Sequence, residues 1–178
     1  MNMAETAEWE KDEWPIIQQE VDACDILILC TSVWLGEKSS VCNRTLEHMY
    51  GYTHQFNSKG QYRDYDKVGA TLITGNEDGV KHCAMSILFS LSHIEYTVPP
   101  QADAGWMGEA GLGPSYMDPG SGGPENDFTN RNTSFLVWNC LHLARMLKDQ
   151  GGIPAYGNLP DEWEAGCKAG MSSPEHKR

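Results

Sequence analysis

Hydrophobic residues along the chain fall into two patterns, short continuous apolar runs and stripes at helical spacing. The runs at residues 25–31 and 68–74 are apolar on both faces, as strands of a parallel sheet covered on both sides would be. A shorter run at 95–98 predicts a third strand. Stripes recurring every three or four residues predict four helices. Their apolar positions are Ile17, Val21 and Cys24; Cys42, Leu46, Met49 and Tyr50; Val80, Cys83, Ala84, Ile87, Leu88 and Leu91; and Leu136, Cys140, Leu143, Ala144 and Leu147.

Polar and small residues mark the ends of these elements. Asp12 can cap the first helix, and the second helix opens at Ser39 or Ser40. The last helix is expected over residues 133–148, with the glycines at 151–152 ending it. These residues favour helix ends because their side chains or backbone conformations allow hydrogen bonds to the N–H and C=O groups that have no partner within the helix.

Three stretches read as connections. Residues 54–67 are polar and form a surface loop, and residues 75–79 form a turn between strand and helix. Residues 99–131 are rich in Gly and Pro and show no periodicity, so they are expected to form a long loop that is functional or disordered.

The order of elements, strand and helix in alternation, is typical of a parallel sheet with right-handed crossovers. Ligands of such sheets bind in the crevice beyond the carboxyl ends of the strands. Two loops lie there by construction, at residues 31–38 and 74–79.

Length and charge narrow the class of protein. The 178 residues suit one α/β domain, with an acidic linker at 1–12, the domain at 13–150 and a tail at 151–178. A net charge of -12 with 13 scattered basic residues argues against nucleic acid or anionic membrane as a partner. No apolar run is long enough for a membrane span, and no secretory signal is visible, so we expect a cytoplasmic protein.

The six cysteines do not predict a metal site. No two of them are separated by only two residues, which is the usual spacing in zinc and redox sites. Most fall on faces that otherwise read as core, where cysteine acts as a small hydrophobe. Reduced thiols also fit the cytoplasm.

Two segments carry a resemblance to a known family. Residues 25–45, DILILCTSVWLGEKSSVCNRT, and residues 68–79, VGATLITGNEDG, resemble the strand–loop–helix units of the NADPH-dependent FMN reductase and iron–sulfur flavoprotein group. The resemblance implies a flavodoxin-like three-layer α/β sandwich with a parallel sheet. It further implies FMN as cofactor, NAD(P)H as cosubstrate, a small-molecule electron acceptor and a homo-oligomer, dimer or tetramer.

The same resemblance places the flavin at the two loops. An isoalloxazine ring needs backbone N–H groups at its edge and an apolar wall at its face. The expected flavin-binding residues are Thr31, Ser32, Val33, Trp34, Leu35, Gly36, Thr74, Gly75, Asn76, Glu77, Asp78 and Gly79. Trp34 is either the wall of the site or a packing residue, and Asp78 could simply cap the next helix. Trp106, Tyr116 and the glycines around them either form a lid over the flavin or belong to a surface loop held down by its aromatic residues.

No constellation of residues predicts a catalytic acid, base or metal site, as expected where the cofactor carries the chemistry. The sequence therefore predicts an FMN-dependent NAD(P)H:acceptor oxidoreductase. A flavin-binding electron carrier without a dedicated substrate and an inactive structural fragment remain the alternatives.

The resemblance fails at the N-terminus. Members of that group begin with a strand and a loop that wraps the FMN phosphate at a helix N-terminus, whereas this chain opens on its acidic linker. The N-terminal β–α unit is thus expected to be missing, which leaves the strand at 26–30 as an apolar edge. Either the sequence is truncated or a neighbouring subunit covers this edge.

Overall fold

The fold is an open sheet between two layers of helices. The computed structural model describes residues 12–76, 78–111 and 113–166. Its strands are β1 (Ile26–Trp34), β2 (Glu37–Lys38), β3 (Val68–Gly75) and β4 (Asp103–Met107), in the order β2-β1-β3-β4. β1, β3 and β4 are parallel, and the short β2 is antiparallel to β1.

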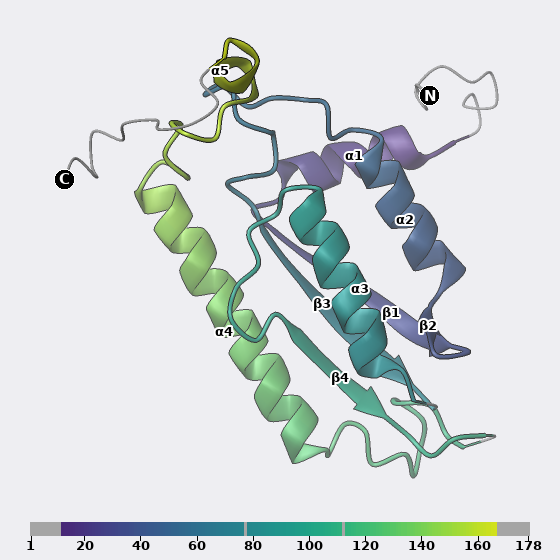
Figure 1. The fold of residues 1–178 in the computed structure, drawn as a ribbon. Coiled ribbons are helices and arrows are strands. Elements are labelled where there is room, and N and C mark those ends of the chain that lie inside the picture. Colours follow the sequence, from purple (N-terminus) through teal and green to yellow (C-terminus); the bar gives the residue numbers. More distant parts are fainter. Residues whose placement is uncertain (1–11, 77, 112, 167–178) are drawn as a thin grey trace.

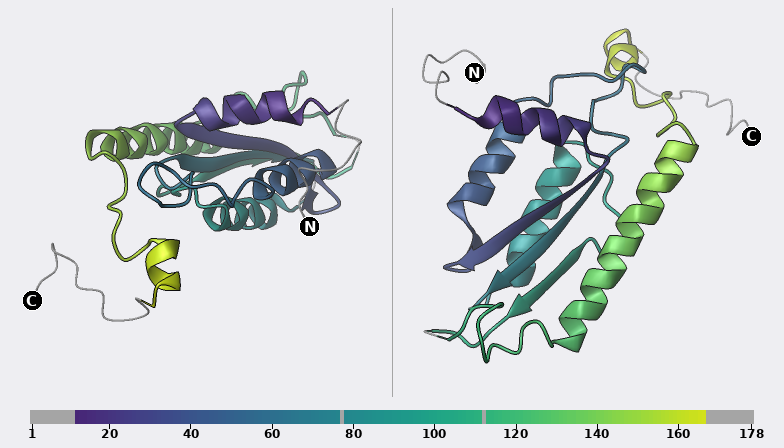
Figure 2. Two further views of the ribbon diagram at one scale, coloured as in Figure 1. Left: turned by 90° about the horizontal axis from the view of Figure 1, so that it is seen from above. Right: turned by 180° about the vertical axis from the view of Figure 1, so that it is seen from behind.

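The helices lie on both faces of this sheet. α2 (Ser40–Tyr50) and α3 (Val80–His93) cover one face, and α4 (Asp127–Asp149) packs on the other (Figures 1 and 2). α1 (Trp14–Ala23) crosses near the start of β1, and α5 (Pro160–Glu164) lies beyond the end of α4 (Figure 1). The predicted flavodoxin-like three-layer α/β sandwich is therefore confirmed.

Alternating side chains of β1 pack into two separate hydrophobic cores. Leu27 and Leu29 pack with residues of α2 and α3, while Ile26 and Ile28 pack with α4. This is the two-sided burial that a continuous apolar run predicts for a parallel strand. Leu136 and Cys140 of α4, which are fully buried, close the second core.

Side-chain caps set the starts of two helices, α2 and α4, whereas the N-cap of α1, Glu13, makes no side-chain cap hydrogen bond. The hydroxyl oxygen of Ser39 accepts a hydrogen bond from the backbone N–H of Cys42 (3.2 Å), which confirms the predicted start of α2. Asp12 Oδ1 accepts from the N–H of Trp14 (3.0 Å) ahead of α1. Asn126 caps α4, so this helix begins six residues before the position expected from its apolar stripe.

The third strand of the parallel sheet lies at Asp103–Met107, and the prediction at 95–98 is wrong. Glu95 has φ +82°, which breaks an extended strand, and only Thr97 forms a bridge, with Val68. The hydrophobic pattern did not predict β4, because close packing requires small residues in this strand. A Cβ on Gly105 would lie 2.5 Å from the carbonyl oxygen of Ile73.

The segment 99–131 is accordingly not one structureless loop. It contains β4 and the first turn of α4, which leaves residues 99–102, 108–111 and 113–126 as the described irregular parts. Residues 32–38 are also more regular than expected. β1 runs on to Trp34, and Leu35 (φ +52°) and Gly36 (φ +78°) form a tight turn into β2.

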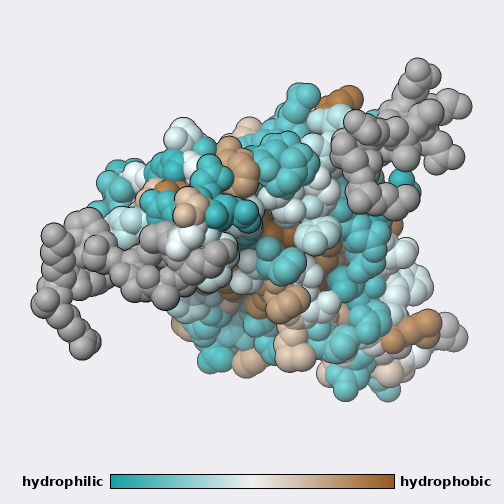
Figure 3. Space-filling view, turned by 45° about the horizontal axis from the view of Figure 1, so that its top comes forward, coloured by the Kyte–Doolittle hydropathy of each residue, from teal (hydrophilic) through white to brown (hydrophobic). Residues whose placement is uncertain are grey.

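The face of the molecule drawn in Figure 3 is mainly hydrophilic. The face in Figure 3 carries apolar residues gathered in a central hollow amid polar surroundings. None of the helices in the described part of the chain is long and apolar enough to cross a membrane.

One carboxyl group ties stability to pH. Burial raises the pKa of Glu95 to about 7, and the nearby Asp64 carboxylate adds to the rise. Because the pKa of this carboxyl group is higher in the folded chain than in the unfolded chain, its protonation favours the folded state. The full stabilisation is present when the pH lies below the pKa of the unfolded chain. This contribution is lost as the pH rises toward 7.

We therefore predict that Glu95→Gln stabilises the protein, relative to the wild type, more at pH 8 than at pH 5. The melting temperature of the variant should exceed that of the wild type by about 2–4 °C more at pH 8 than at pH 5. The effect is modest because Glu95 is only partly buried and solvent screens it. Thermal unfolding followed by circular dichroism at both pH values measures it. Glu20→Gln, at an exposed position of α1, serves as the control. An equal difference for Glu95→Gln at both pH values would contradict the prediction.

Candidate functional site

A cleft of about 480 Å³ opens at the carboxyl ends of β1 and β3, beside the loop that follows β4. This is the edge at which open α/β sheets bind ligands. Three chain segments that are far apart in sequence line it. The lining residues are Ser32, Val33, Trp34, Thr74, Gly75, Asn76, Ala110, Gly111, Ser115 and Tyr116.

The close approach of β1 and β3 creates the floor of this cleft. The two strands pair in register up to Ser32 and Thr74. A Cβ on Gly75 would lie 2.7 Å from Cβ of Val33, which is closer than packed carbons come. Glycine at this position therefore lets the buried Val33 close the core directly beneath the cleft.

Aromatic side chains stand at the walls. Trp34 is 65% exposed, and its indole Nε1 donates a hydrogen bond to Ser32 Oγ (2.8 Å), which fixes the ring beside the cleft. Tyr116 packs edge-on against the buried ring of Trp106, with 5.5 Å between ring centroids. The cleft thus offers flat apolar surface from two sides.

The loop that follows β4 is tied to the end of β3. Asn76 Nδ2 donates to the carbonyl oxygens of Gly113 (2.7 Å) and Pro114 (3.0 Å). The backbone N–H of Gly108 donates to the carbonyl of Gly75 (2.8 Å). These bonds hold Ser115 and Tyr116 over the cleft.

Six of the twelve predicted flavin-binding residues line the cleft: Ser32, Val33, Trp34, Thr74, Gly75 and Asn76. Thr31 instead serves the start of α2, because its Oγ1 accepts from the N–H of Ser39 (3.2 Å). Leu35 and Gly36 form the tip of the hairpin.

Gly79 packs beneath that hairpin tip rather than in the cleft. It has φ +139°, and a Cβ there would lie 2.7 Å from the carbonyl of Gly36. Asp78 lines a different hollow, beside the start of α4. Glu77 lies outside the described residues.

Sequence reasoning missed Ala110, Gly111 and Ser115. They are small residues in an aperiodic segment, so no pattern distinguishes them from any other loop. The single signal was Tyr116, an aromatic residue in a Gly-rich stretch, and the structure places it in the cleft.

The described lining of the cleft is uncharged. Among the described residues that line it, none carries a charged side chain, and the polar groups are hydroxyls, one amide and backbone. The carboxyl group with a strongly raised pKa, Glu95, is not among the lining residues. The described part of the chain also holds no cluster of three His, Cys, Asp or Glu that could bind a metal ion.

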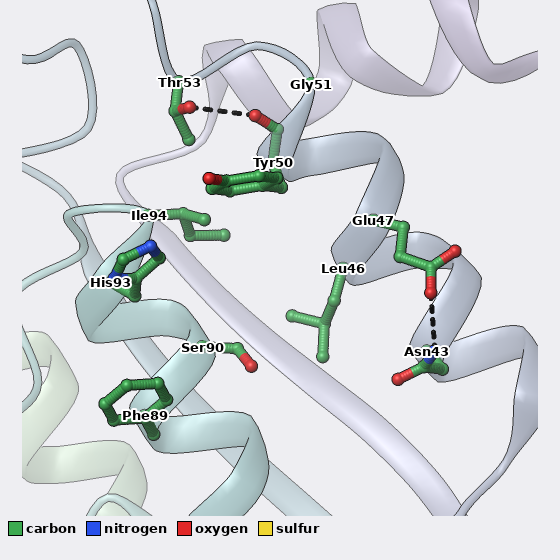
Figure 4. Close-up of a pocket in the computed structure, with 10 residues that line it drawn as sticks. All are labelled: Asn43, Leu46, Glu47, Tyr50, Gly51, Thr53, Phe89, Ser90, His93 and Ile94. Atoms are coloured by element: carbon green, nitrogen blue, oxygen red, sulfur yellow. Dashed lines mark hydrogen bonds between the residues drawn. The ribbon is translucent and has the colours of Figure 1, made fainter. Parts of the chain in front are cut away.

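A second, larger cavity of about 640 Å³ lies between α2 and α3. Figure 4 shows Tyr50 and His93 at one end of it, Phe89 beside them, and Leu46 and Ile94 toward its floor. His93 stacks against both Tyr50 (5.8 Å) and Phe89 (5.9 Å). This groove lies toward the C-terminal ends of the helices, away from the carboxyl ends of the strands. We therefore take the first cleft as the candidate site.

Comparison with known proteins identifies relatives of this chain. No family model matches the sequence. Over 148 residues the chain is 37% identical to 8-demethyl-8-aminoriboflavin-5′-phosphate synthase of Streptomyces davaonensis, covering 83% of this chain and 56% of that protein. Over 167 residues it is 54% identical to the divalent metal cation transporter MntH of Mycobacterium bovis, covering 93% of this chain but 24% of that protein. The chain thus spans about half and about a quarter of the length of these relatives.

The fold comparison agrees with the first of these relatives. The crystal structure of RosB with the bound intermediate 8-demethyl-8-formylriboflavin-5′-phosphate matches this chain with a TM-score of 0.79 and 29% identity. The match covers 100% of this chain and 74% of that one.

These relatives correct the functional prediction. The resemblance to the NADPH-dependent FMN reductase group was wrong, and so were the NAD(P)H:acceptor oxidoreductase function and the pairing of an FMN cofactor with NAD(P)H. The alternatives, an electron carrier or an inactive fragment, fit no better. The error has a physical reason. An apolar strand followed by a Gly-containing loop indicates where a flavin can bind. It does not indicate whether the flavin is a cofactor or a substrate.

The tether from Asn76 generates a prediction. Asn76→Ala removes two hydrogen bonds to the loop, each contributing roughly 1 kcal/mol. Amide hydrogens of residues 113–118 should then exchange at least about tenfold faster. Hydrogen exchange read by mass spectrometry measures this.

Asn130→Ala is the matched control for this experiment. Its Nδ2 likewise donates to a carbonyl of the same long connection, that of Pro124 (2.9 Å), but outside the cleft. Unchanged exchange at 113–118 in Asn76→Ala, or an equal increase in Asn130→Ala, would count against the tether.

Proposed function

We propose that this chain forms the flavin-holding part of an enzyme that chemically modifies riboflavin-5′-phosphate, with the flavin bound as substrate. The observation that carries this proposal is the match over the whole chain to a structure that holds a riboflavin-5′-phosphate derivative as an intermediate. The 37% identity to a synthase of an aminoriboflavin phosphate supports it. The transporter relative contributes nothing to this proposal, because this chain covers only 24% of it.

The dimensions and chemistry of the cleft support this ligand class. Its volume of about 480 Å³ falls within the range of small-molecule sites. The ring system of a flavin is flat and largely apolar, with carbonyls and ring nitrogens along one edge. Trp34 and Tyr116 offer aromatic surface to its faces, and Ser32, Thr74 and Ser115 offer hydroxyl groups to its edge.

The described lining residues are suited to binding and orientation. They offer hydrogen bonds and apolar contact but no charged side chain to move protons at neutral pH. In this proposal they hold the flavin ring in a fixed pose, while the groups that carry out the modification lie outside the described cleft residues. A homo-oligomer and a cytoplasmic location stay predictions.

The proposal is tested first by binding. Tyr116→Ala removes one aromatic wall, which contributes about 0.5–1.5 kcal/mol beyond its buried area. The dissociation constant for riboflavin-5′-phosphate should therefore rise about tenfold or more. Quenching of flavin fluorescence in an equilibrium titration measures it.

Tyr50→Ala is the control, because Tyr50 is half-exposed and lines the groove between α2 and α3 instead. It should leave the dissociation constant unchanged. A loss of affinity in Tyr50→Ala with none in Tyr116→Ala would move the flavin to the other cavity. No saturable binding of riboflavin-5′-phosphate by the wild type would refute the proposed function.

A further inference from the structure

The hairpin formed by β1 and β2 carries one wall of the cleft but has little strand pairing of its own. Within the described part of the chain, β2 pairs only through Lys38 with Val33 and through Glu37 with Trp34. A two-stranded hairpin by itself is marginally stable in water. Trp34 is 65% exposed and Leu35, at the tip, is 91% exposed, so their burial contributes little. The position of the hairpin beyond Val33 therefore depends on contacts with a neighbouring element.

The first two turns of α3 provide these contacts. His82 Nε2 lies 2.7 Å from Glu37 Oε1. Lys38 Nζ donates a hydrogen bond to Ser86 Oγ (2.8 Å). Because His82 and Ser86 are four residues apart, they lie on one flank of the helix. Each of the two residues of β2 thus has its own partner on that flank.

The turn of the hairpin also rests directly on the start of α3. Cys83 Sγ lies 3.8 Å from the carbonyl oxygen of Gly36, as a weak donor. Gly79, the N-cap of α3, packs against the same carbonyl, and a Cβ there would lie 2.7 Å from its oxygen. The backbone of the turn and the two side-chain contacts therefore fasten the hairpin to one helix.

The ring of Trp34 follows the hairpin. Its backbone lies directly opposite Glu37, and its indole Nε1 donates to Ser32 Oγ of the same strand (2.8 Å). Trp34 and Ser32 line the cleft, whereas His82 and Ser86 do not. A contact between α3 and β2 can thus act on the cleft only through the hairpin.

We propose that His82 and Ser86 are positioning residues of the flavin site, which fasten β2 to α3 and so fix the ring of Trp34 against the bound flavin. This inference rests on the proposed function. α3 follows the end of β3, whose residues Thr74 and Gly75 line the cleft across from Trp34. Fastening the hairpin to α3 therefore fixes the separation of the two strand ends. A wall that is already in place spares the ligand the cost of ordering it.

A positioning role differs measurably from a role in overall stability. The side chains of His82 and Glu37 are 54% and 58% exposed, and ion pairs this exposed contribute little to the free energy of unfolding. Their loss should leave the melting temperature nearly unchanged and still free the hairpin, which has few other contacts. Neither this pair nor the half-buried Ser86 is needed for the hydrophobic core.

The first measurement follows Trp34 in the absence of flavin. The chain is labelled with fluorotryptophan, and the fluorine NMR signal of Trp34, one of six tryptophans, is identified by its loss in Trp34→Phe. In the double variant His82→Ala/Ser86→Ala we expect this signal to shift and to narrow, because the ring becomes more mobile. The signal of Trp138, which is exposed on α4, should stay where it is.

The second measurement is the dissociation constant for riboflavin-5′-phosphate, read by quenching of flavin fluorescence. It should rise about threefold or more in the double variant, the size expected from the loss of an exposed ion pair and one hydrogen bond. Replacing His82→Ala by His82→Gln in that variant should recover about half of the lost affinity or more. The glutamine amide can still donate a hydrogen bond to Glu37.

Lys81→Ala is the matched control. Lys81 lies in the same turn of α3 and also loses an ion pair, but its partner is Asp103 at the start of β4. This variant should leave both the Trp34 signal and the dissociation constant unchanged. Equal changes in Lys81→Ala would show a general loosening of α3 and overturn the proposal.

The two measurements separate the failure of this inference from the failure of the proposed function. An unchanged Trp34 signal in the double variant overturns the inference, and so does an unchanged dissociation constant when the wild type binds. Absence of saturable binding by the wild type instead refutes the proposed function. The Trp34 signal then shows by itself whether His82 and Ser86 hold the hairpin.

Discussion

The parallel pairing of β1 with β3 is the constraint on which the rest of the structure depends. It aligns Ile26–Ser32 with Val68–Thr74, so both strands end at the same level. Since Gly75 has no side chain, the buried Val33 can close the core immediately below. The two loops that follow are thereby brought to one edge of the sheet, and the cleft exists because these strand ends meet.

The cleft gains its third wall from a loop that has no regular structure of its own. The amide of Asn76 bonds to two carbonyls of this loop, and Tyr116 rests edge-on against the buried Trp106 of β4. Strand register places Trp106 opposite Thr74, next to the cleft. An otherwise irregular segment is thus positioned by contacts with the sheet, and aromatic surface faces a neutral pocket.

Much of the fold could be predicted from the sequence, because β1, β3, α2, α3 and α4 carry strong patterns. β4 could not, because its sequence, DAGWM, is short and contains Gly105, which close packing against Ile73 requires. The strand expected at 95–98 failed since Glu95 adopts a backbone conformation that no propensity reveals.

The candidate site was predicted in part for the same reason. Residues at strand ends, such as Ser32 and Asn76, follow from topology, and the structure brings them together. Thr31 is not among the residues that line the cleft, because its hydroxyl bonds to the start of α2. Ala110, Gly111 and Ser115 reach the cleft only through tertiary contacts, which a local pattern does not contain.

The chemistry of the described cleft residues suits one part of a flavin phosphate better than the other. A ligand that carries a phosphate needs donors or cations near its charge, and the described cleft offers an apolar and hydroxyl-lined surface suited to the ring alone. In the proposed function, the described cleft residues therefore hold and orient the ring, and the aromatic side chains of Trp34 and Tyr116 set the plane in which it lies.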